Sequence, residues 1–141
     1  MCLNIKKPLK ESIVIAKKDI YVWKYLIFEN GVLLSPYRGY KYEIDELVKV
    51  KFSKKELNEM SVSIGLHTYR NLMSVFSINK DERNDYVVAK CIIPKGSRYV
   101  KGTFVHESYA SEELKVISIH KFDDIKPSLL DKIRHSIFMP L

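Results

Sequence analysis

Two stretches of the chain, residues 20–28 and 86–93, are apolar at nearly every position and rich in β-branched and aromatic side chains. Short apolar runs bounded by turn residues are typical of strands that are buried on both faces. The Asn30-Gly31 pair that follows the first stretch is typical of a tight hairpin turn. We therefore predict that these two stretches are the central strands of one sheet.

Residues 42–52 end in a different pattern, in which apolar residues alternate with Lys49 and Lys51. Alternation with a period of two predicts a strand that has one exposed face. Residues 114–121 are also predicted to form a strand, because their isoleucines and valines are spaced for a pleated surface. Shorter strands are predicted for residues 61–64 and 98–102.

Helical signals are fewer and shorter than strand signals. Ser53 and Glu56 have the spacing of a capping box, which predicts a short helix that ends near residue 60. Residues 69–77 place apolar side chains at helical spacing and predict a second short helix. Residues 126–137 carry an apolar stripe, with a proline in the first turn and basic residues in the last, so we predict a C-terminal helix there.

Strands outnumber helices in this pattern, and strands do not alternate regularly with helices. We therefore predict an α+β fold, with a mostly antiparallel or mixed sheet, two or three short helices and a C-terminal helix. At 141 residues the chain has the usual length of one domain. We expect residues 1–11 to form a flexible N-terminal arm and residues 12–141 to form a single α+β domain.

The chain is basic, with a net charge of +7, and the charge is unevenly distributed. Residues 1–55 hold 12 Lys and Arg but 6 Asp and Glu, so most of the excess lies there. A basic face of this kind can bind nucleic acid or an acidic protein. Lysine accounts for 19 of the 24 basic residues, however, and specific phosphate or base recognition relies more on arginine. A solvated lysine-rich surface is therefore the favoured interpretation.

The two cysteines, Cys2 and Cys91, lie near the N-terminus and inside a predicted buried strand, respectively. Cysteines in such places are typical of free thiols in a reducing compartment. The N-terminal residues have no apolar signal core, and no apolar run approaches the roughly 20 residues that a spanning helix needs. We expect a cytoplasmic protein that does not associate with membranes.

Familiar catalytic and cofactor motifs do not occur in the sequence. No two of the four histidines have zinc-motif spacing, and neither cysteine has a local partner ligand. A phosphate-binding glycine loop and a nucleophile elbow are also missing. Cys91 is a poor candidate nucleophile, because burial raises a thiol pKa. We predict no catalytic residue, no metal site and no cofactor.

Two polar segments contain residues that are suited to binding a ligand. In the first, Arg38 lies between Tyr37 and Tyr40, so the guanidinium can hold an anion while a ring stacks on a planar group. In the second, Gly65 precedes His67 and Tyr69, which can place an imidazole and a phenol beside one cleft. The alternative for both segments is structural. In that case the tyrosines cover the end of the sheet, Arg38 pairs with a nearby acid, and His67 bonds to the backbone.

A third polar segment contains Lys95 and Arg98, which can bind an anion, with Glu112 or Glu113 as carboxylate partners. The alternative is a basic turn and an acidic turn that both face solvent. Across the three segments, the predicted ligand-binding or partner-binding residues are Tyr37, Arg38, Tyr40, His67, Tyr69, Lys95 and Arg98.

The order of these segments resembles a class of small bacterial and phage α+β proteins to which no activity is assigned. The resemblance runs from about residue 20 to residue 120, through Tyr37-Arg38-Gly39, Gly65-Leu66-His67 and Ile93-Pro94-Lys95-Gly96. These motifs are short. The resemblance implies an α+β scaffold and does not imply a reaction.

A more distant similarity is to ADP-ribosyltransferases of the Arg–Ser–Glu type. Arg38-Gly39 corresponds to their Arg-Gly, and Ser61-Val62-Ser63 corresponds to their Ser-x-Ser. Glu112 and Glu113 stand in the place of their Glu-x-Glu but are adjacent rather than spaced by one residue. The similarity implies an NAD-binding enzyme or a degenerate relative of one.

From these observations we expect a small non-enzymatic binding or interaction protein with a protein partner, and the phage resemblance points to a host factor. The first alternative is an NAD-using transferase, with Arg38 on the dinucleotide phosphates and Glu113 as the catalytic carboxylate. The second alternative is a nucleic-acid-binding protein that uses the basic first 55 residues, although no nucleic-acid-binding motif is present.

Overall fold

The protein is built mainly from antiparallel strands. In a computed structural model that describes residues 2–36, 38–78 and 86–121, 52% of the residues lie in strands and 10% in helices. The predicted α+β class is therefore wrong, and the described part of the chain is closer to an all-β fold. The excess of strand arises partly because residues 66–69 and 106–111, for which no strand was predicted, pair within the sheet.

The described residues form a 12-stranded sheet and three short helical segments. The strands are β1 (Leu3–Asn4), β2 (Val14–Ile15), β3 (Ile20–Glu29), β4 (Val32–Leu34), β5 (Lys41–Tyr42), β6 (Leu47–Lys49), β7 (Ser61–Val62), β8 (Leu66–Tyr69), β9 (Tyr86–Ile93), β10 (Arg98–Phe104), β11 (His106–Ser111) and β12 (Glu113–Lys121). The helices are α1 (Leu9–Ser12), the 3₁₀ turn η1 (Lys54–Glu56) and α2 (Leu72–Ile78).

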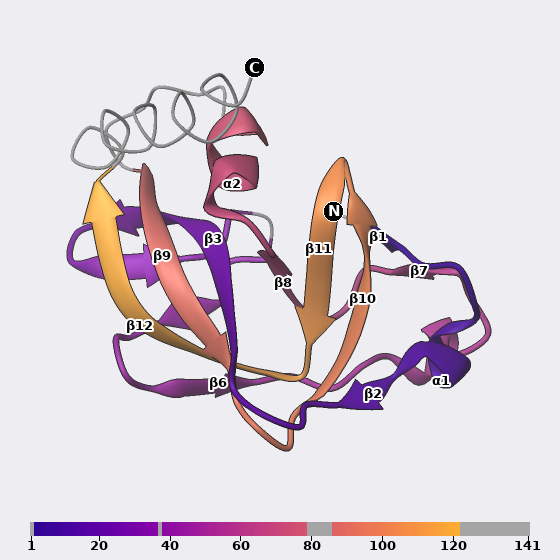
Figure 1. The fold of residues 1–141 in the computed structure, drawn as a ribbon. Coiled ribbons are helices and arrows are strands. Elements are labelled where there is room, and N and C mark those ends of the chain that lie inside the picture. The colour runs from indigo at the N-terminus through magenta and orange to yellow at the C-terminus, as the bar shows by residue number, and fades with distance from the viewer. Residues whose placement is uncertain (1, 37, 79–85, 122–141) are drawn as a thin grey trace, which may run out of the picture.

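The strand order along the sheet is β6-β12-β9-β3-β8-β11-β10-β1-β7, with β2 added beside β10 and β4 linking β3 to β5. All of these strand pairs are antiparallel, as the sequence pattern allowed. Figure 1 shows β12, β9 and β3 on one side of the molecule and β11 and β10 on the other, with α2 between their upper ends.

The two strands predicted to be central lie side by side in the middle of the sheet. β3 pairs with β9 over eight positions, from Ile20 opposite Ile93 to Ile27 opposite Tyr86. Each strand has other neighbours, so both are enclosed in the sheet, which agrees with their apolar sequences. The alternate residues of β3 and β9 that face the interior form the main core. Its fully buried members include Val22, Leu26, Ala89, Cys91, Ile93, Leu114 and Val116.

The hairpin between β3 and β4 turns at Asn30 and Gly31, as predicted. Both residues have left-handed backbone angles, with φ values of 51° and 77°. Two consecutive residues with positive φ suit the right-handed twist of the flanking strands, and asparagine and glycine tolerate that geometry best. The turn brings β4 and the loop that follows it beside β3.

The N-terminal segment, which was expected to be a flexible arm, contributes two elements to the domain. β1 pairs with both β7 and β10, and Leu3 and Leu9 are fully buried. These two leucines pack in a second core cluster with Phe52, Val62 and Val100. Apolar residues near a chain end can be held in this way when a sheet edge offers them a backbone partner.

Other predicted elements occur in altered form. The strand expected over residues 42–52 is divided into β5 and β6, because Asp45 adopts a left-handed conformation with φ 67° between them. The helix expected from Ser53 is the single turn η1, in which the Ser53 hydroxyl oxygen accepts a hydrogen bond from the Lys55 N–H. The predicted C-terminal helix over residues 126–137 lies outside the described residues.

Within residues 2–36, 38–78 and 86–121, no helix has the length and apolar character needed to cross a membrane.

Candidate functional site

An open cavity lies where the sheet loosens between β3 and β8. In the described part of the chain these two strands pair at one position, Trp23 opposite Tyr69. The cavity encloses about 480 Å³, its open mouth included, and the loop between β4 and β5 forms one wall. It is lined by Lys24, Tyr25, Ser35, Pro36, Arg38, Tyr40, Ser63, Gly65, His67 and Tyr69.

Lys24 is the most unusual residue of the cavity lining, because it is a lysine in the middle of a central strand and is only 8% exposed. Its Nζ donates a 2.7 Å hydrogen bond to the backbone carbonyl oxygen of His67 and lies 5.8 Å from the centre of the Tyr42 ring. Burial lowers the pKa of Lys24 to about 8, while nearby Cys91 acts in the opposite direction. An appreciable fraction of the side chain is therefore a neutral amine near physiological pH.

Arg38 lies at the exposed side of the cavity, on the loop between β4 and β5. Its Nη2 donates a long hydrogen bond of 3.4 Å to the carbonyl oxygen of Ser63, which also lines the cavity. A guanidinium has five N–H donors, and within the described residues this hydrogen bond engages a single one of them. Arg38 can therefore bind an anion at the mouth.

The wall beside Arg38 is held by the carboxylate of Glu56. Its Oε2 accepts hydrogen bonds from the Ser63 N–H at 2.9 Å and from the Ser63 hydroxyl at 2.8 Å. Its Oε1 accepts a bond of 3.0 Å from the Ile64 N–H. Burial alone would raise the pKa of Glu56, but these hydrogen bonds and the charge of Arg38 outweigh burial and lower it. Glu56 therefore positions the segment that carries Ser63 and Gly65 into the lining.

His67 lines the cavity, but its ring is occupied by the backbone. Nδ1 lies 3.1 Å from the Gly65 carbonyl oxygen, and Nε2 lies 3.0 Å from the Val62 carbonyl oxygen. Burial lowers the pKa of His67, and the positive charge of Lys24 lowers it further, against the effect of these two carbonyl groups. A neutral ring can donate to one of the two oxygens, and in either tautomer it holds the turn between β7 and β8. His67 thus acts as a positioning residue.

Three tyrosines complete the lining, namely Tyr25, Tyr40 and Tyr69. Tyr40 is held in place by its backbone, whose N–H donates to the Ser35 hydroxyl at 2.8 Å and whose carbonyl oxygen accepts from the Ser35 N–H at 2.9 Å. Aromatic faces around a cationic group suit a flat ring that carries negative charge. The cavity therefore combines stacking surfaces with cationic groups.

The electrostatic character of the cavity is one-sided. Among the described residues that line it, Lys24 and Arg38 carry positive charge and none is an aspartate or glutamate. The two glutamates of the transferase similarity lie elsewhere in hydrogen-bonded positions. The Glu112 Oε2 accepts from the Phe52 N–H at 2.8 Å, and the Glu113 Oε2 accepts from the Ser97 hydroxyl at 3.2 Å.

The structure brings the first two predicted segments together at this cavity. Arg38, Tyr40, His67 and Tyr69 all line it, although they come from positions up to 31 residues apart. Tyr37 lies outside the described residues. The second segment forms β8, which leads into α2, and all four residues of β8 are buried.

The third predicted segment does not join the cavity. The Lys95 backbone N–H donates to the Asp19 carboxylate at 2.9 Å, and its side chain is exposed. The Arg98 Nη1 lies 3.5 Å from the Glu112 Oε1 in a partly exposed ion pair. Arg98 is therefore paired with one of its expected carboxylate partners, away from the cavity.

The prediction of site residues missed Lys24. The signal was present in the sequence, because one lysine interrupts a run of apolar residues from 20 to 28 that otherwise reads as buried on both faces. A charged group in a buried strand requires partners, and such groups gather at functional sites. Its partner, the His67 carbonyl oxygen, is 43 residues away and could not be identified from local pattern.

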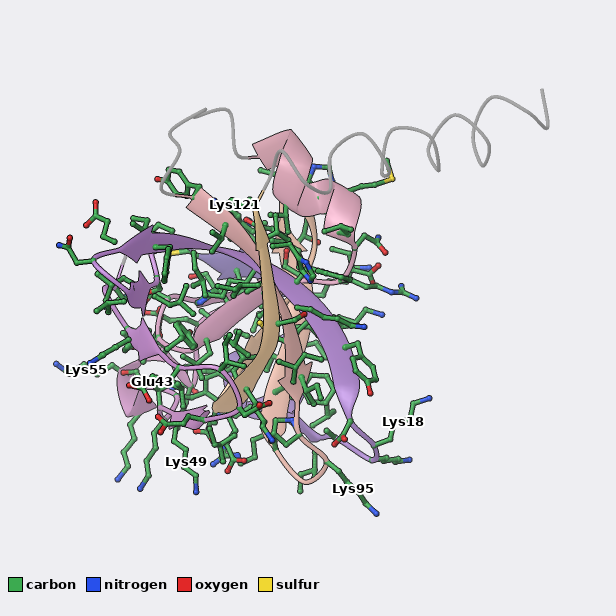
Figure 2. The ribbon with its side chains drawn as sticks, turned by 90° about the vertical axis from the view of Figure 1, so that its left-hand side faces the viewer. Lys18, Glu43, Lys49, Lys55, Lys95 and Lys121 are labelled. Carbon is green, nitrogen blue, oxygen red and sulfur yellow. The ribbon has the colours of Figure 1, made fainter. Side chains whose placement is uncertain are left out.

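The lysine-rich surface is dispersed over the molecule. Figure 2 shows Lys55 and Lys49 on one side and Lys18 and Lys95 on the other, with all four side chains directed outward. Within the described residues, no group of three or more histidine, cysteine or acidic side chains is arranged to hold a metal ion.

Comparisons with family models, with curated proteins and with solved structures give no match to this chain. The chemistry of the cavity is therefore the main indication of function.

Proposed function

We propose that this protein is a binding protein whose cavity takes a small anionic ligand that contains a flat ring. The observation that carries the proposal is the convergence of Arg38 and Lys24 with three tyrosines in one opening that no described carboxylate lines. This proposal keeps the expected non-enzymatic binding function but gives it a small-molecule ligand in place of the expected protein partner. Phosphate or carboxylate on an aromatic or heteroaromatic ring is the chemistry that these side chains recognise.

The position of the charges supports this ligand class. Arg38 is exposed at the mouth, and Lys24 is buried deeper in the sheet. A ligand would therefore bind with its anionic group against Arg38 and its ring between the tyrosines.

Thermal stability in the presence of defined probes tests the proposal. AMP and pyridoxine 5′-phosphate are planar and anionic, and adenosine and pyridoxine are their neutral counterparts. We expect at least one phosphorylated probe to stabilise the protein, and its neutral counterpart to bind at least about ten-fold more weakly, because the charged hydrogen bonds to Arg38 are lost.

Arg38→Ala is expected to remove this preference for the phosphorylated probe with only a small loss of stability in the free protein, since the side chain is exposed and makes a long hydrogen bond to Ser63. Arg98→Ala is the matched control, because Arg98 is an exposed arginine that does not line the cavity. The proposal fails if neither phosphorylated probe binds at millimolar concentration. It also fails if the Arg38 and Arg98 variants bind the probe equally well.

The transferase alternative has one supporting observation, the contact of Arg38 with Ser63 at the edge of the cavity. These are two of the three positions that carry the similarity to the Arg–Ser–Glu enzymes. The third position lacks support, because Glu112 and Glu113 bond to other groups and do not line the cavity. Binding without catalysis is therefore the function that we propose, and NAD is a further planar anion to be included among the probes.

The protein-partner interpretation has support of a different kind. Tyr21 is 56% exposed on β3, and the Lys90 Nζ lies 5.1 Å from the centre of its ring. An exposed ring beside a cation is a common component of protein interfaces.

The nucleic-acid alternative has less support, because the lysines point in many directions (Figure 2). We propose a cytoplasmic location, since both Cys2 and Cys91 are free thiols.

A further inference from the structure

The position of Lys24 carries a consequence for ligand chemistry beyond attraction of a negative charge. Its side chain lines the cavity, yet the residue is 8% exposed and is surrounded by the main core. The core residues Cys91 and Tyr42 interact with it electrostatically, and the Tyr42 hydroxyl, also buried, has no hydrogen-bond partner among the described residues. A simple anion site would place its cation at the mouth, where Arg38 already lies.

We infer that Lys24 captures its ligand covalently, by forming an imine with an aldehyde or ketone group on the planar anion that the cavity binds. This inference rests on the proposed function, because Arg38 and the tyrosines must first orient the ligand. It adds the requirement that the ligand carries a carbonyl group that can reach Lys24 while the anionic group lies against Arg38.

The chemistry needs no oxidant, reductant or metal. The Lys24 ammonium first releases a proton to solvent, and the lone pair of the resulting amine attacks the carbonyl carbon to give a carbinolamine. Loss of one water molecule then leaves the C=N bond of the imine. A desolvated lysine is suited to this reaction, because burial increases the fraction of neutral amine at neutral pH.

The hydrogen bond of Lys24 determines the direction of its side chain. Its Nζ donates to the His67 carbonyl oxygen, and the His67 ring is held by the carbonyl oxygens of Val62 and Gly65. The amine is thereby kept at the lining where β3 and β8 separate, rather than extending to solvent as a surface lysine does. Pre-positioning of this kind favours attack on a bound carbonyl over random reaction with free aldehyde.

Borohydride trapping with pyridoxal 5′-phosphate tests the inference. This probe is planar, anionic and an aldehyde, and pyridoxine 5′-phosphate is the matching alcohol that cannot form an imine. After incubation with limiting probe and reduction, we expect intact mass to show one adduct per chain and peptide mapping to place it on Lys24. We expect the probe to require Arg38, so Arg38→Ala should lower the labelling by about ten-fold or more at equal concentration.

Two variants of Lys24 and one control keep the test decisive. Lys24→Met keeps the length of the side chain, and Lys24→Arg keeps its positive charge. Both variants should lose the adduct. Circular dichroism should confirm that at least one of them is folded. Lys90→Arg is the matched control, because Lys90 lies on β9 beside the rings of Tyr21 and Trp23 but does not line the cavity. This control should be labelled as fully as the wild type.

The outcomes separate the inference from the proposed function. If pyridoxine 5′-phosphate binds in an Arg38-dependent way but the aldehyde gives no adduct on Lys24, the inference is overturned and the binding function stands. An adduct spread over many lysines, equal in the wild type and in Lys24→Met, also overturns it. If neither phosphorylated probe binds, both are overturned for this ligand class.

Discussion

The Nζ of Lys24 donates a 2.7 Å hydrogen bond to the backbone carbonyl oxygen of His67, and this bond connects the two strands that border the cavity. β3 and β8 pair at one position in the described chain, Trp23 opposite Tyr69, so their ladder supplies little of the connection. A lysine side chain therefore bridges the place where the sheet opens. Because the bridge is buried, its charge state affects both the stability of the fold and the chemistry of the cavity.

Replacement of Lys24 by methionine should change the pH dependence of stability. Burial lowers the pKa of Lys24 to about 8, from 10.5 in the unfolded chain. Between these values the unfolded state binds more protons than the folded state, so Lys24 makes the wild type more stable as the pH rises. Denaturant unfolding at pH 7.5, 9 and 10 should show the wild type gaining about 2–3 kcal/mol relative to Lys24→Met.

Lys101→Met provides a control of opposite sign. A hydrogen bond from Lys101 to Glu107, helped by the Glu107 charge, raises the pKa of that exposed lysine. Its contribution should therefore decrease as the pH rises through the folded-state pKa. A flat difference between the wild type and Lys24→Met across this range would mean that Lys24 titrates normally, and would remove the basis for a neutral amine in the cavity.

Glu56→Gln should destabilise the wall of the cavity. The carboxylate accepts three hydrogen bonds, two from Ser63 on one oxygen and one from Ile64 on the other. In glutamine only the amide oxygen can accept, so the donors that face the NH₂ group lose their acceptor. We expect a loss of about 1–3 kcal/mol in the free energy of unfolding at pH 7. The pKa of Glu56 is lowered in the fold, so this difference should be present above pH 4.5 and disappear as the pH falls through the folded value.

Glu11→Gln, which changes an exposed carboxylate on α1, is the matched control and should leave the free energy of unfolding unchanged. Equal free energies of unfolding of the Glu56→Gln variant and the wild type at pH 7 would show that the cavity wall at Ser63 and Ile64 does not depend on this carboxylate. Probe binding at the cavity should weaken together with the loss of stability, because Ser63 lines it.

The elements that were predicted correctly are those whose pattern is local. β3 and β9 are continuous apolar runs, and the turn at Asn30 and Gly31 needs only two residues to specify it. β11 could not be recognised in the same way, because His106–Ser111 is polar and four of its six residues are buried only through pairing with β8 and β10. Tertiary pairing overrides intrinsic strand preference in such segments.

The candidate site was likewise predictable only where residue type, a local feature, was enough to identify its members. Arg38, Tyr40, His67 and Tyr69 were identified from residue type, but their convergence depends on how the β4–β5 loop and β8 lie against β3. Lys95 and Arg98 have equally suitable chemistry and lie outside the cavity, so residue type alone could not distinguish the two groups. Only the three-dimensional path of the chain separates them.

Gly102→Ala should detach the N-terminal strand from the sheet. A Cβ at this position would collide with the Asn4 carbonyl oxygen and would approach the Leu3 Cγ to 2.9 Å, and backbone cannot move aside cheaply. We expect a loss of about 2–4 kcal/mol, with hydrogen exchange accelerated first in β1. Gly96→Ala is the control, since its φ of 90° is strained for alanine but no atom lies within 4 Å of the added Cβ.

That control should cost about 1 kcal/mol and leave β1 protected from exchange. If Gly102→Ala were as mild as Gly96→Ala, the close packing of β1 on β10 would be contradicted. The position therefore tests directly whether residues 3–4 belong to the sheet.

The two cysteines should differ strongly in reactivity. Cys2 is exposed, whereas Cys91 is 0% exposed in the main core, where burial raises the pKa of its thiol to about 12 against a smaller opposing effect of the Lys24 charge. Because the thiolate is the reactive form, iodoacetamide at pH 8 should alkylate Cys2 at least about 100-fold faster in the native protein. In denaturant both thiols should react at similar rates, as peptide mapping over time would show. Rapid native alkylation of Cys91 would mean that the cavity side of β9 opens to solvent, and Lys24 could then no longer be treated as desolvated.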